Sequence, residues 1–279
     1  MKLYLIGNGF DIDLGYNTSY KSFINSQEFS KLIQNNSANR LAKFIYSNYQ
    51  TDTNWVDIEI IIGKYANGVC NDDPAILLHQ YNEIKNELKI YLKRQESKYD
   101  IIQQGQTRAF RFLREINDEI NSNSNVLIVN FNFTDTVLNR LKYINGGEHD
   151  RSNLKYYHPH GILSTDIAFG VNEMFLDDTA NQYSFIKKGY SENYSLNGWM
   201  NIFKNGLKIS VFGHSLGTTD VDIIKPMFDY FLNNPDMNRQ ITIIDQKEAY
   251  QIVINRIDQL VSRRINTFKL TNSLSINPY

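Results

Sequence analysis

Short apolar runs recur along the chain and alternate with longer stretches in which apolar residues have helical spacing. The clearest runs cover residues 3–6, 126–129, 207–212 and 241–244. Runs this short and apolar are typical of parallel strands that are covered on both faces. Their alternation with helical patterns predicts an α/β fold, a Rossmann-like, mostly parallel sheet with helices on both faces. Weaker patterns predict a strand that runs into a turn over 156–161, and further strands at 167–170 and 265–270.

Residues 30–123 contain no confident strand pattern. Apolar side chains there recur at helical spacing, and Asn71-Asp72-Asp73-Pro74 has the composition of a helix start. We therefore predict one α/β domain over residues 1–279, in which 30–123 form a helical insertion or lid subdomain. Residues 1–29 and 124–279 would form a core of the nucleotide-binding type. The polar and aromatic stretch 171–197 is expected to be a loop over a cleft.

Composition narrows the class of protein. The chain has 279 residues, a formal charge of −1 and one cysteine, Cys70. One cysteine excludes an internal disulfide and a multi-cysteine zinc site, and it fits a reducing cytoplasm. The opening apolar run is too short for a secretory signal, and no apolar stretch approaches the ~20 residues that span a bilayer. We expect a cytoplasmic protein without a membrane partner, and no overall charge that would recruit nucleic acid.

The first predicted strand ends in the turn Gly7-Asn8-Gly9-Phe10-Asp11. Glycines let backbone N–H groups approach a ligand, and a following helix N-terminus favours an anion. Such a turn binds phosphate in nucleotide-binding sheets. The third glycine of the full fingerprint is absent, because Ile12 stands at its position. The turn therefore predicts either a nucleotide site or a plain tight turn into a helix.

A second glycine turn, Gly213-His214-Ser215-Leu216-Gly217, lies between a predicted strand and a predicted helix. It matches the nucleophile elbow of serine hydrolases. In that fold the base is a histidine that follows the serine, and this chain has no histidine after His214. A serine without a base is a poor nucleophile, so a ligand-binding turn at a strand end is the better interpretation.

Four polar residues follow predicted strands: Asn132, Asp135, His160 and Asp220. In a doubly wound sheet such positions converge, so these side chains could share a pocket with the first glycine turn. His160 titrates near neutral pH and could act as a general base, while the Asn132 amide could orient a water molecule or a ribose hydroxyl. Taken singly, each residue could also be a helix cap or a hydrogen-bonded core residue.

Two further clusters contain side chains that could carry chemistry. His158 and His160 could share a strand face and bind a metal ion, but the intervening Pro159 distorts that geometry and no third ligand stands out, so no metal is predicted. Trp55 and Glu59 are four residues apart and would share a helix face. Glu59 could enter the cleft, or it could be solvated beside an anchoring tryptophan.

Taken together, these motifs resemble the AbiH family of bacterial phage-abortive-infection proteins. The resemblance covers nearly the whole chain and rests on five motifs in order: 7–11 with 18–20, 55–59, 130–136, 160–161, and 213–217 with Asp220. It implies a role in anti-phage defence, in which an infected cell stops growing before the phage matures. The family itself implies no particular reaction.

The same order of motifs also resembles sirtuin-like domains, which bind NAD and in defence systems often hydrolyse it. This resemblance implies that Asn132, His160 and Asp135 are catalytic. It implies NAD-binding roles for the residues of the two glycine turns and one aspartate: Gly7, Asn8, Gly9, Phe10, Asp11, Gly213, His214, Ser215 and Asp220. The sequence departs from the sirtuin pattern at Asn8 and Thr134, and the zinc-binding cysteines of deacetylating sirtuins are absent.

The sequence thus predicts a defence protein that binds NAD and hydrolyses its nicotinamide–ribose bond. The alternatives are a sensor that binds a nucleotide or a phage component without turnover, and, less favoured, a nuclease or a serine esterase. The expected partners are a nucleotide and a phage-derived trigger, and self-association into a homo-oligomer is left open.

Overall fold

In the computed structural model, the described residues are 1–34, 39–51, 57–98, 105–144, 152–172, 175–194 and 203–278. They divide into two compact units. Unit 1 comprises Met1–Tyr16, Tyr99–Pro159 and Ser195–Tyr279, and unit 2 comprises Asn17–Lys98 and His160–Tyr194. Within these residues, no helix is both long and apolar enough to cross a membrane.

Unit 1 is built on a parallel sheet with the strand order β3-β2-β1-β4-β5-β6. Its strands are β1 (Lys2–Ile6), β2 (Val126–Asn130), β3 (Leu154–Tyr157), β4 (Lys208–Phe212), β5 (Gln240–Asp245) and β6 (Leu274–Pro278). Every pair of neighbouring strands is parallel. The predicted α/β fold with a Rossmann-like parallel sheet is therefore confirmed.

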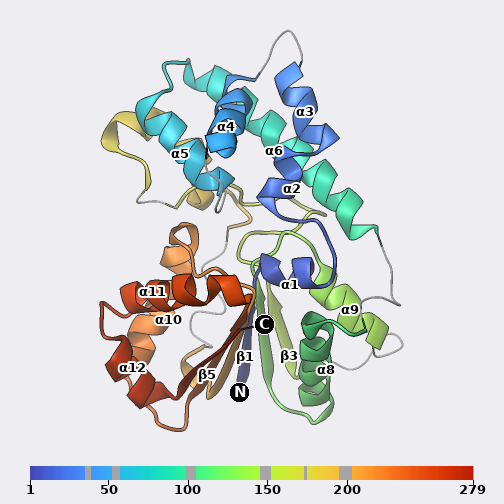
Figure 1. Cartoon of the computed structure of the whole chain (residues 1–279), viewed down its shortest axis with the longest axis vertical. Coiled ribbons are helices and arrows are strands. Elements are labelled where there is room, and N and C mark those ends of the chain that lie inside the picture. The colour runs from blue at the N-terminus through green and yellow to red at the C-terminus, as the bar shows by residue number, and fades with distance from the viewer. Residues whose placement is uncertain are drawn as a thin grey trace. The chain divides into compact units, whose positions relative to one another are not determined.

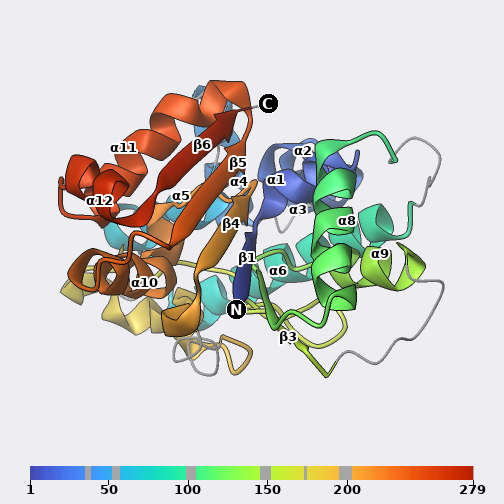
Figure 2. The same cartoon turned by 90° about the horizontal axis from the view of Figure 1, so that it is seen from below.

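The helices of unit 1 cover both faces of this sheet (Figures 1 and 2). They are α1 (Asn8–Asp13), α8 (Arg108–Asn121), α9 (Thr136–Ile144), α10 (Val221–Asn233), α11 (Tyr250–Leu260) and α12 (Ile265–Asn272). Tyr4 and Ile6 share one apolar cluster with the buried side chains of α1, α8 and α9. Because side chains alternate along a strand, Leu3 and Leu5 face the other side, which α10, α11 and α12 cover.

The sequence misplaced two features of the polypeptide. Residues 265–270, predicted as a strand, form most of α12, and β6 begins only after Ser273, whose φ of 43° turns the chain. In α12, Phe268 and Asn272 are buried one helical turn apart while Leu270 is exposed, which is a helical pattern. Residues 167–170, also predicted as a strand, make only an isolated bridge from Ile167 to Gly161.

Helix α8, which falls within the stretch 30–123 predicted as a helical insertion, belongs to unit 1. Its apolar face, which contains Phe112, Leu113 and Ile116, packs in the same cluster as the strands. Thr107 caps its first turn, with the N–H of Phe110 donating to Thr107 Oγ1 at 3.1 Å. The helix is thus part of the sheet's cover.

Unit 2 is mainly helical. Its helices are α2 (Tyr20–Ile24), α3 (Gln27–Gln34), α4 (Arg40–Thr51), α5 (Ile58–Gly68) and α6 (Pro74–Glu96), and the 3₁₀ segments η2 (Asp178–Ile186) and η3 (Lys188–Tyr190) complete it. The start of α6 matches the sequence signal, because Asp73 accepts a hydrogen bond from the N–H of Ala75 and Pro74 occupies the first turn. The segment expected as the loop 171–197 contains η2 and η3. Whether unit 2 acts as a lid stays a prediction.

Candidate functional site at the carboxyl ends of the strands

The strand order of unit 1 reverses at β1, because the strands that follow it in the chain lie first on one side and then on the other. In open α/β sheets, ligands bind beyond the carboxyl ends of the strands at this point. Here those ends carry the loop after β1, the loop after β2 and the loop after β4. Most of the site residues predicted from sequence belong to these three loops.

The glycine turns after β1 and β4 pack directly on each other. The N–H of Gly7 donates to Phe212 O at 3.0 Å, and the N–H of Gly9 donates to Gly213 O at 2.9 Å. A Cβ at Gly9 would lie 2.6 Å from Gly213 Cα, and Gly213 itself has a φ of 60°. The glycines are therefore required by backbone contact between the turns.

This packing bears on the predicted pyrophosphate site. Besides Gly7 and Gly9, Phe10 also uses its N–H within the protein, donating to Gly7 O at 3.0 Å. The Phe10 ring is fully buried and makes an edge contact with Phe212. A phosphate at this turn would have to displace these bonds or use other groups. The assignment of residues 7–11 to ligand binding stays a prediction.

Asp11 fixes the loop after β2. Its buried carboxylate accepts hydrogen bonds from Thr134 Oγ1 at 2.5 Å and from Thr136 Oγ1 at 2.6 Å. The N–H of Phe131 donates to Ile6 O at 2.8 Å, and the Phe131 ring lies 4.2 Å from the His214 ring. The three loops therefore form one connected structure over the end of β1.

Asn132 lies in the middle of this loop. Its N–H donates to Asn130 Oδ1 at 3.1 Å, and its carbonyl oxygen is 3.1 Å from His158 Nδ1. Its side chain is buried, yet neither the amide nitrogen nor the amide oxygen has a hydrogen-bond partner among the described residues. A buried amide with unused donors and acceptors is costly unless another group completes its bonds. The backbone of Asn132 is fixed while its side chain is available.

His158 is the histidine next to Asn132. A carbonyl oxygen can only accept, so His158 Nδ1 carries the proton and donates to Asn132 O. Its Nε2 lies 3.4 Å from Asp135 Oδ1. The Tyr156 hydroxyl accepts a hydrogen bond from Asn130 Nδ2 at 3.0 Å. Burial of this hydroxyl raises the pKa of Tyr156, and the negative charge of Asp135 raises it further. We refer to Asn132, Asp135 and His158 as the strand-end site.

Sequence reasoning placed Asn132 and Asp135 correctly at a strand end but chose His160 as their partner. Strand β3 ends at Tyr157, so His158 is the first residue beyond it and lies in the turn that the sequence predicts over 157–161. His160 belongs to unit 2, where its ring stacks on that of Tyr194. A catalytic role for His160 stays a prediction. The contact of His158 with the carbonyl group of Asn132 is a tertiary contact, and no sequence signal indicates it.

The turn after β4 has no geometry of a serine hydrolase. His214 Nδ1 accepts the N–H of Leu216 at 3.0 Å, so Nε2 carries the proton and faces Asp220 Oδ2 at 3.4 Å. Among the described residues, no histidine nitrogen lies within hydrogen-bond distance of the Ser215 hydroxyl. The positive φ beyond Gly213 falls on Leu216, at 51°, and not on Ser215. These contacts hold the turn together.

Polar groups continue from this turn to the end of β5. Arg256 Nη1 donates to Ser215 O at 2.5 Å. Burial raises the pKa of Asp245. This effect is partly opposed by a hydrogen bond from the N–H of Gln246 and by the nearby side chains of His214 and Arg256. Whether Ser215 and Asp220 contact the adenosine part of a ligand stays a prediction.

The remaining predicted site residues lie elsewhere. Trp55 is outside the described residues. Glu59 is buried in unit 2, where Glu59 Oε2 is 3.0 Å from Lys188 Nζ and Oε1 accepts the N–H of Gly170 at 3.1 Å. It is therefore buried and not solvated, and a lysine pairs with it. Within the described ranges, no group of three or more His, Cys, Asp and Glu side chains could hold a metal ion.

Comparison with known proteins gives the family. A model of the family described as "Bacteriophage abortive infection AbiH" matches residues 3–245, which include the three loops at the strand ends and the whole of unit 2. A search of curated proteins found no match. The match covers most of the chain and ends with the last residue of β5. The chain belongs to the AbiH family of bacteriophage abortive infection proteins.

Proposed function

We propose that this protein acts in phage defence by binding NAD at the carboxyl ends of its strands and hydrolysing the bond between nicotinamide and ribose. The observation that carries the proposal is Asn132, a buried amide without a hydrogen-bond partner among the described residues. It lies at the end of β2, next to the point where the strand order reverses. The strand order β3-β2-β1-β4-β5-β6 is the one found in dinucleotide-binding sheets, which supports a dinucleotide as the ligand.

Asn132 has the properties needed for positioning a reactant. Its backbone is held at both the N–H and the carbonyl group, so little ordering of the loop would be required when a ligand binds. The free amide has a donor and an acceptor, and it could hold a ribose hydroxyl and a water molecule in a fixed relation.

The reaction needs little covalent chemistry from the protein. As the C1′–N bond of the ribose breaks, its electron pair leaves with nicotinamide, which departs as a neutral molecule. The ribose centre becomes oxocarbenium-like, and a nearby carboxylate such as Asp135 would stabilise this charge. The oxygen of a water molecule then bonds to C1′ and loses a proton, giving ADP-ribose.

His158 is our candidate for the group that receives this proton. It contacts the carbonyl group of Asn132, and its Nε2 is 3.4 Å from Asp135 Oδ1, so the imidazolium formed by taking up a proton would be paired with this carboxylate. His160, which the resemblance to sirtuin-like domains implies as the base, is the alternative. The two histidines are separated by one residue and can be tested side by side.

The test is to incubate the purified protein with NAD and to measure free nicotinamide and ADP-ribose by chromatography. We expect release by the wild type and loss in Asn132→Ala. Asn139→Ala is the matched control, because Asn139 is exposed on α9 only seven residues further on. Loss of about 100-fold or more in His158→Ala, with activity kept in His160→Ala, would assign the base to His158. Absence of release from folded wild-type protein, including protein isolated from infected cells, would contradict the proposal.

A nucleotide sensor without turnover is the second candidate. It is favoured by the fact that both ring nitrogens of His214 already have partners within the protein, so this histidine is not available to take a proton from water. In that case calorimetry would detect NAD binding that Asn132→Ala weakens, while no nicotinamide would appear.

A further inference from the structure

Asp245, the last residue of β5, lies at the same end of the sheet as the strand-end site and has no part in the proposed reaction. Strands β4 and β5 are paired in register up to Phe212 and Ile244. Just beyond this pair, the N–H of Gly213 donates to Ile244 O at 2.9 Å. Asp245 therefore follows directly on the contact between β5 and the glycine turn after β4.

The carboxylate of Asp245 has one oxygen in use and one available. Its Oδ1 accepts the N–H of Gln246 at 2.8 Å, whereas its Oδ2 makes no hydrogen bond with any residue that the structure describes. The side chain is half-buried, and Oδ2 is not among the buried polar atoms. Burial raises the pKa of Asp245, so a hydrogen-bond donor on a ligand would stabilise its charged form.

Ser215 and Arg256 belong to the same group of side chains. Arg256 Nη1 donates to Ser215 O, and the positive charge of Arg256 acts on Asp245. The Ser215 hydroxyl is half-buried and makes no hydrogen bond within the described part of the chain. A hydroxyl and a carboxylate are suited to the neighbouring hydroxyls of a ribose, because these both donate and accept hydrogen bonds.

The position of Asn132 determines which way a dinucleotide would extend. Asn132 follows β2, and in the described sheet only β3 lies beyond β2 on one side. On the other side, β1, β4 and β5 follow in that order, and β5 is roughly 14 Å from β2 at a strand spacing of about 4.8 Å. A dinucleotide with its nicotinamide ribose at Asn132 would thus cross the turns after β1 and β4 and bring its second ribose toward the end of β5.

We infer that Asp245 binds the adenosine ribose and makes the site selective for NAD over NADP. This role rests on the proposed function, since it takes NAD as the ligand. A carboxylate at a strand end accepts a hydrogen bond from the 2′-hydroxyl of NAD, whereas the 2′-phosphate of NADP would place a second negative charge against it. An arginine can accommodate such a phosphate, so Arg256 would favour NADP once the carboxylate is neutralised.

Asp245→Asn tests this role, because the amide has the shape of the carboxylate and can still accept the N–H of Gln246. If nicotinamide is released, kcat/KM is measured with NAD and with NADP; if the ligands bind without release, calorimetry gives the two dissociation constants. We expect the wild type to favour NAD by about tenfold or more. In Asp245→Asn, NAD should be used or bound about tenfold less well and NADP better than in the wild type.

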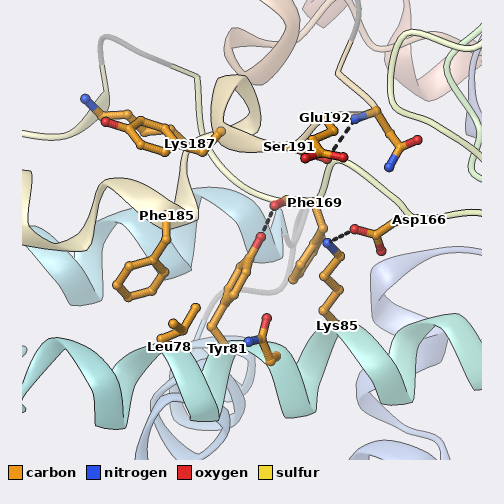
Figure 3. A pocket seen from close by; sticks show the side chains of 12 residues that line it. Leu78, Tyr81, Lys85, Asp166, Phe169, Phe185, Lys187, Ser191 and Glu192 are labelled. Atoms are coloured by element: carbon orange, nitrogen blue, oxygen red, sulfur yellow. Dashed lines mark hydrogen bonds and ion pairs between the residues drawn. The ribbon is translucent and has the colours of Figure 1, made fainter.

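Asp236→Asn is the matched control. Asp236 is also half-buried and accepts the N–H of Asn238 at 2.9 Å, but it precedes β5 and thus lies at the opposite end of the sheet. A second control is Asn82→Ala, at an exposed position on α6 that lines a separate pocket of unit 2 (Figure 3). Both controls should keep the wild-type preference.

The outcomes separate the role of Asp245 from the proposed hydrolysis. Equal use of NAD and NADP by the wild type, or a wild-type preference in Asp245→Asn, would overturn the role of Asp245 and leave the hydrolysis standing. Binding without nicotinamide release, with the preference lost in Asp245→Asn, would support the role of Asp245 and contradict the hydrolysis. Weaker NAD binding in Asn82→Ala but not in Asp245→Asn would place the ligand in unit 2, and absence of binding by both dinucleotides would overturn both proposals.

Discussion

At the level of single residues, the glycines at the ends of β1 and β4 allow two turns of the backbone to pack against each other. The two turns approach so closely that side chains cannot fit between them: a Cβ at Gly7 would lie 2.6 Å from His214 Cα, and one at Gly213 would lie 2.6 Å from Gly9 Cα. The sequence marked these glycines as a ligand-binding signal. Their contacts show that the same pattern is already required by packing of the protein on itself.

Gly9→Ala should therefore destabilise the protein whether or not a ligand binds. The added methyl group would meet the backbone of Gly213, which cannot move without breaking the bond from the N–H of Gly9 to Gly213 O. Forcing an extra carbon into a closely packed place costs about 1–3 kcal/mol, and we expect a loss of this size in urea denaturation.

Gly68→Ala is the matched control. A Cβ at Gly68, the last residue of α5, has nothing within 4 Å and needs no unusual φ. The free energy of unfolding of Gly68→Ala should differ from that of the wild type by less than about 0.5 kcal/mol, or should exceed it. If Gly9→Ala were as stable as Gly68→Ala, the close contact between the turns would not exist in solution.

At the scale of elements, a buried ion pair joins η3 to α5 in unit 2. Lys188 and Glu59 have side chains only 1% and 5% exposed, and their charged atoms are 3.0 Å apart. Glu59 also accepts the N–H of Gly170, so one carboxylate holds two parts of the segment 160–194. Neither residue carries a sequence signal for the other, because they are far apart in the chain and belong to different elements.

Breaking this pair from either side should be strongly destabilising. Glu59→Gln leaves a buried ammonium without its carboxylate, and Lys188→Met leaves a buried carboxylate, each at a cost of about 3–5 kcal/mol in the free energy of unfolding. In the double variant, the loss in free energy of unfolding should be smaller than the sum of the losses in the two single variants, because no uncompensated charge remains. Urea denaturation of the four proteins measures this coupling.

The exposed pair of Lys225 and Asp229 on α10 provides the comparison. Its atoms are 2.7 Å apart, closer than in the buried pair, but both side chains are about two-fifths exposed. Lys225→Met should cost less than about 1 kcal/mol, because water screens the charges. If Lys225→Met and Lys188→Met lowered the free energy of unfolding equally, the buried pair would contribute no more to stability than the exposed pair.

At the scale of the whole molecule, family membership and strand order together direct attention to one set of loops. The AbiH match covers residues 3–245, which include β1, β2 and β4 with the loops that follow them. These loops meet where the order of the parallel strands reverses. A defence function that depends on chemistry should therefore depend on the strand-end site.

In cells that express the protein, Asn132→Ala should abolish protection against phage, while Asn139→Ala should keep it. The efficiency of plating of a phage panel measures protection, and an immunoblot checks that both variants accumulate equally. Full protection by a stable Asn132→Ala protein would show that defence does not use the strand-end site.

The class of fold and much of the candidate site can be predicted from the amino-acid sequence. Apolar runs that end in glycine or in polar residues identified β1, β2, β4 and β5, because strands buried on both faces must be apolar throughout. The same rule placed Asn132 and Asp135 at a strand end. Ordered motifs were sufficient to indicate the AbiH family.

Which residues are partners becomes visible only in the folded protein. The strand end at Tyr157 makes His158 the neighbour of Asn132, and the contact between two backbones explains the glycines of both turns. It also pairs Glu59 with Lys188 across more than a hundred residues. The spacing of apolar residues in the sequence indicates which face of a helix or strand is buried, but it gives no information about the distances between elements. Those distances depend on packing, so partners distant in sequence appear only in the folded chain.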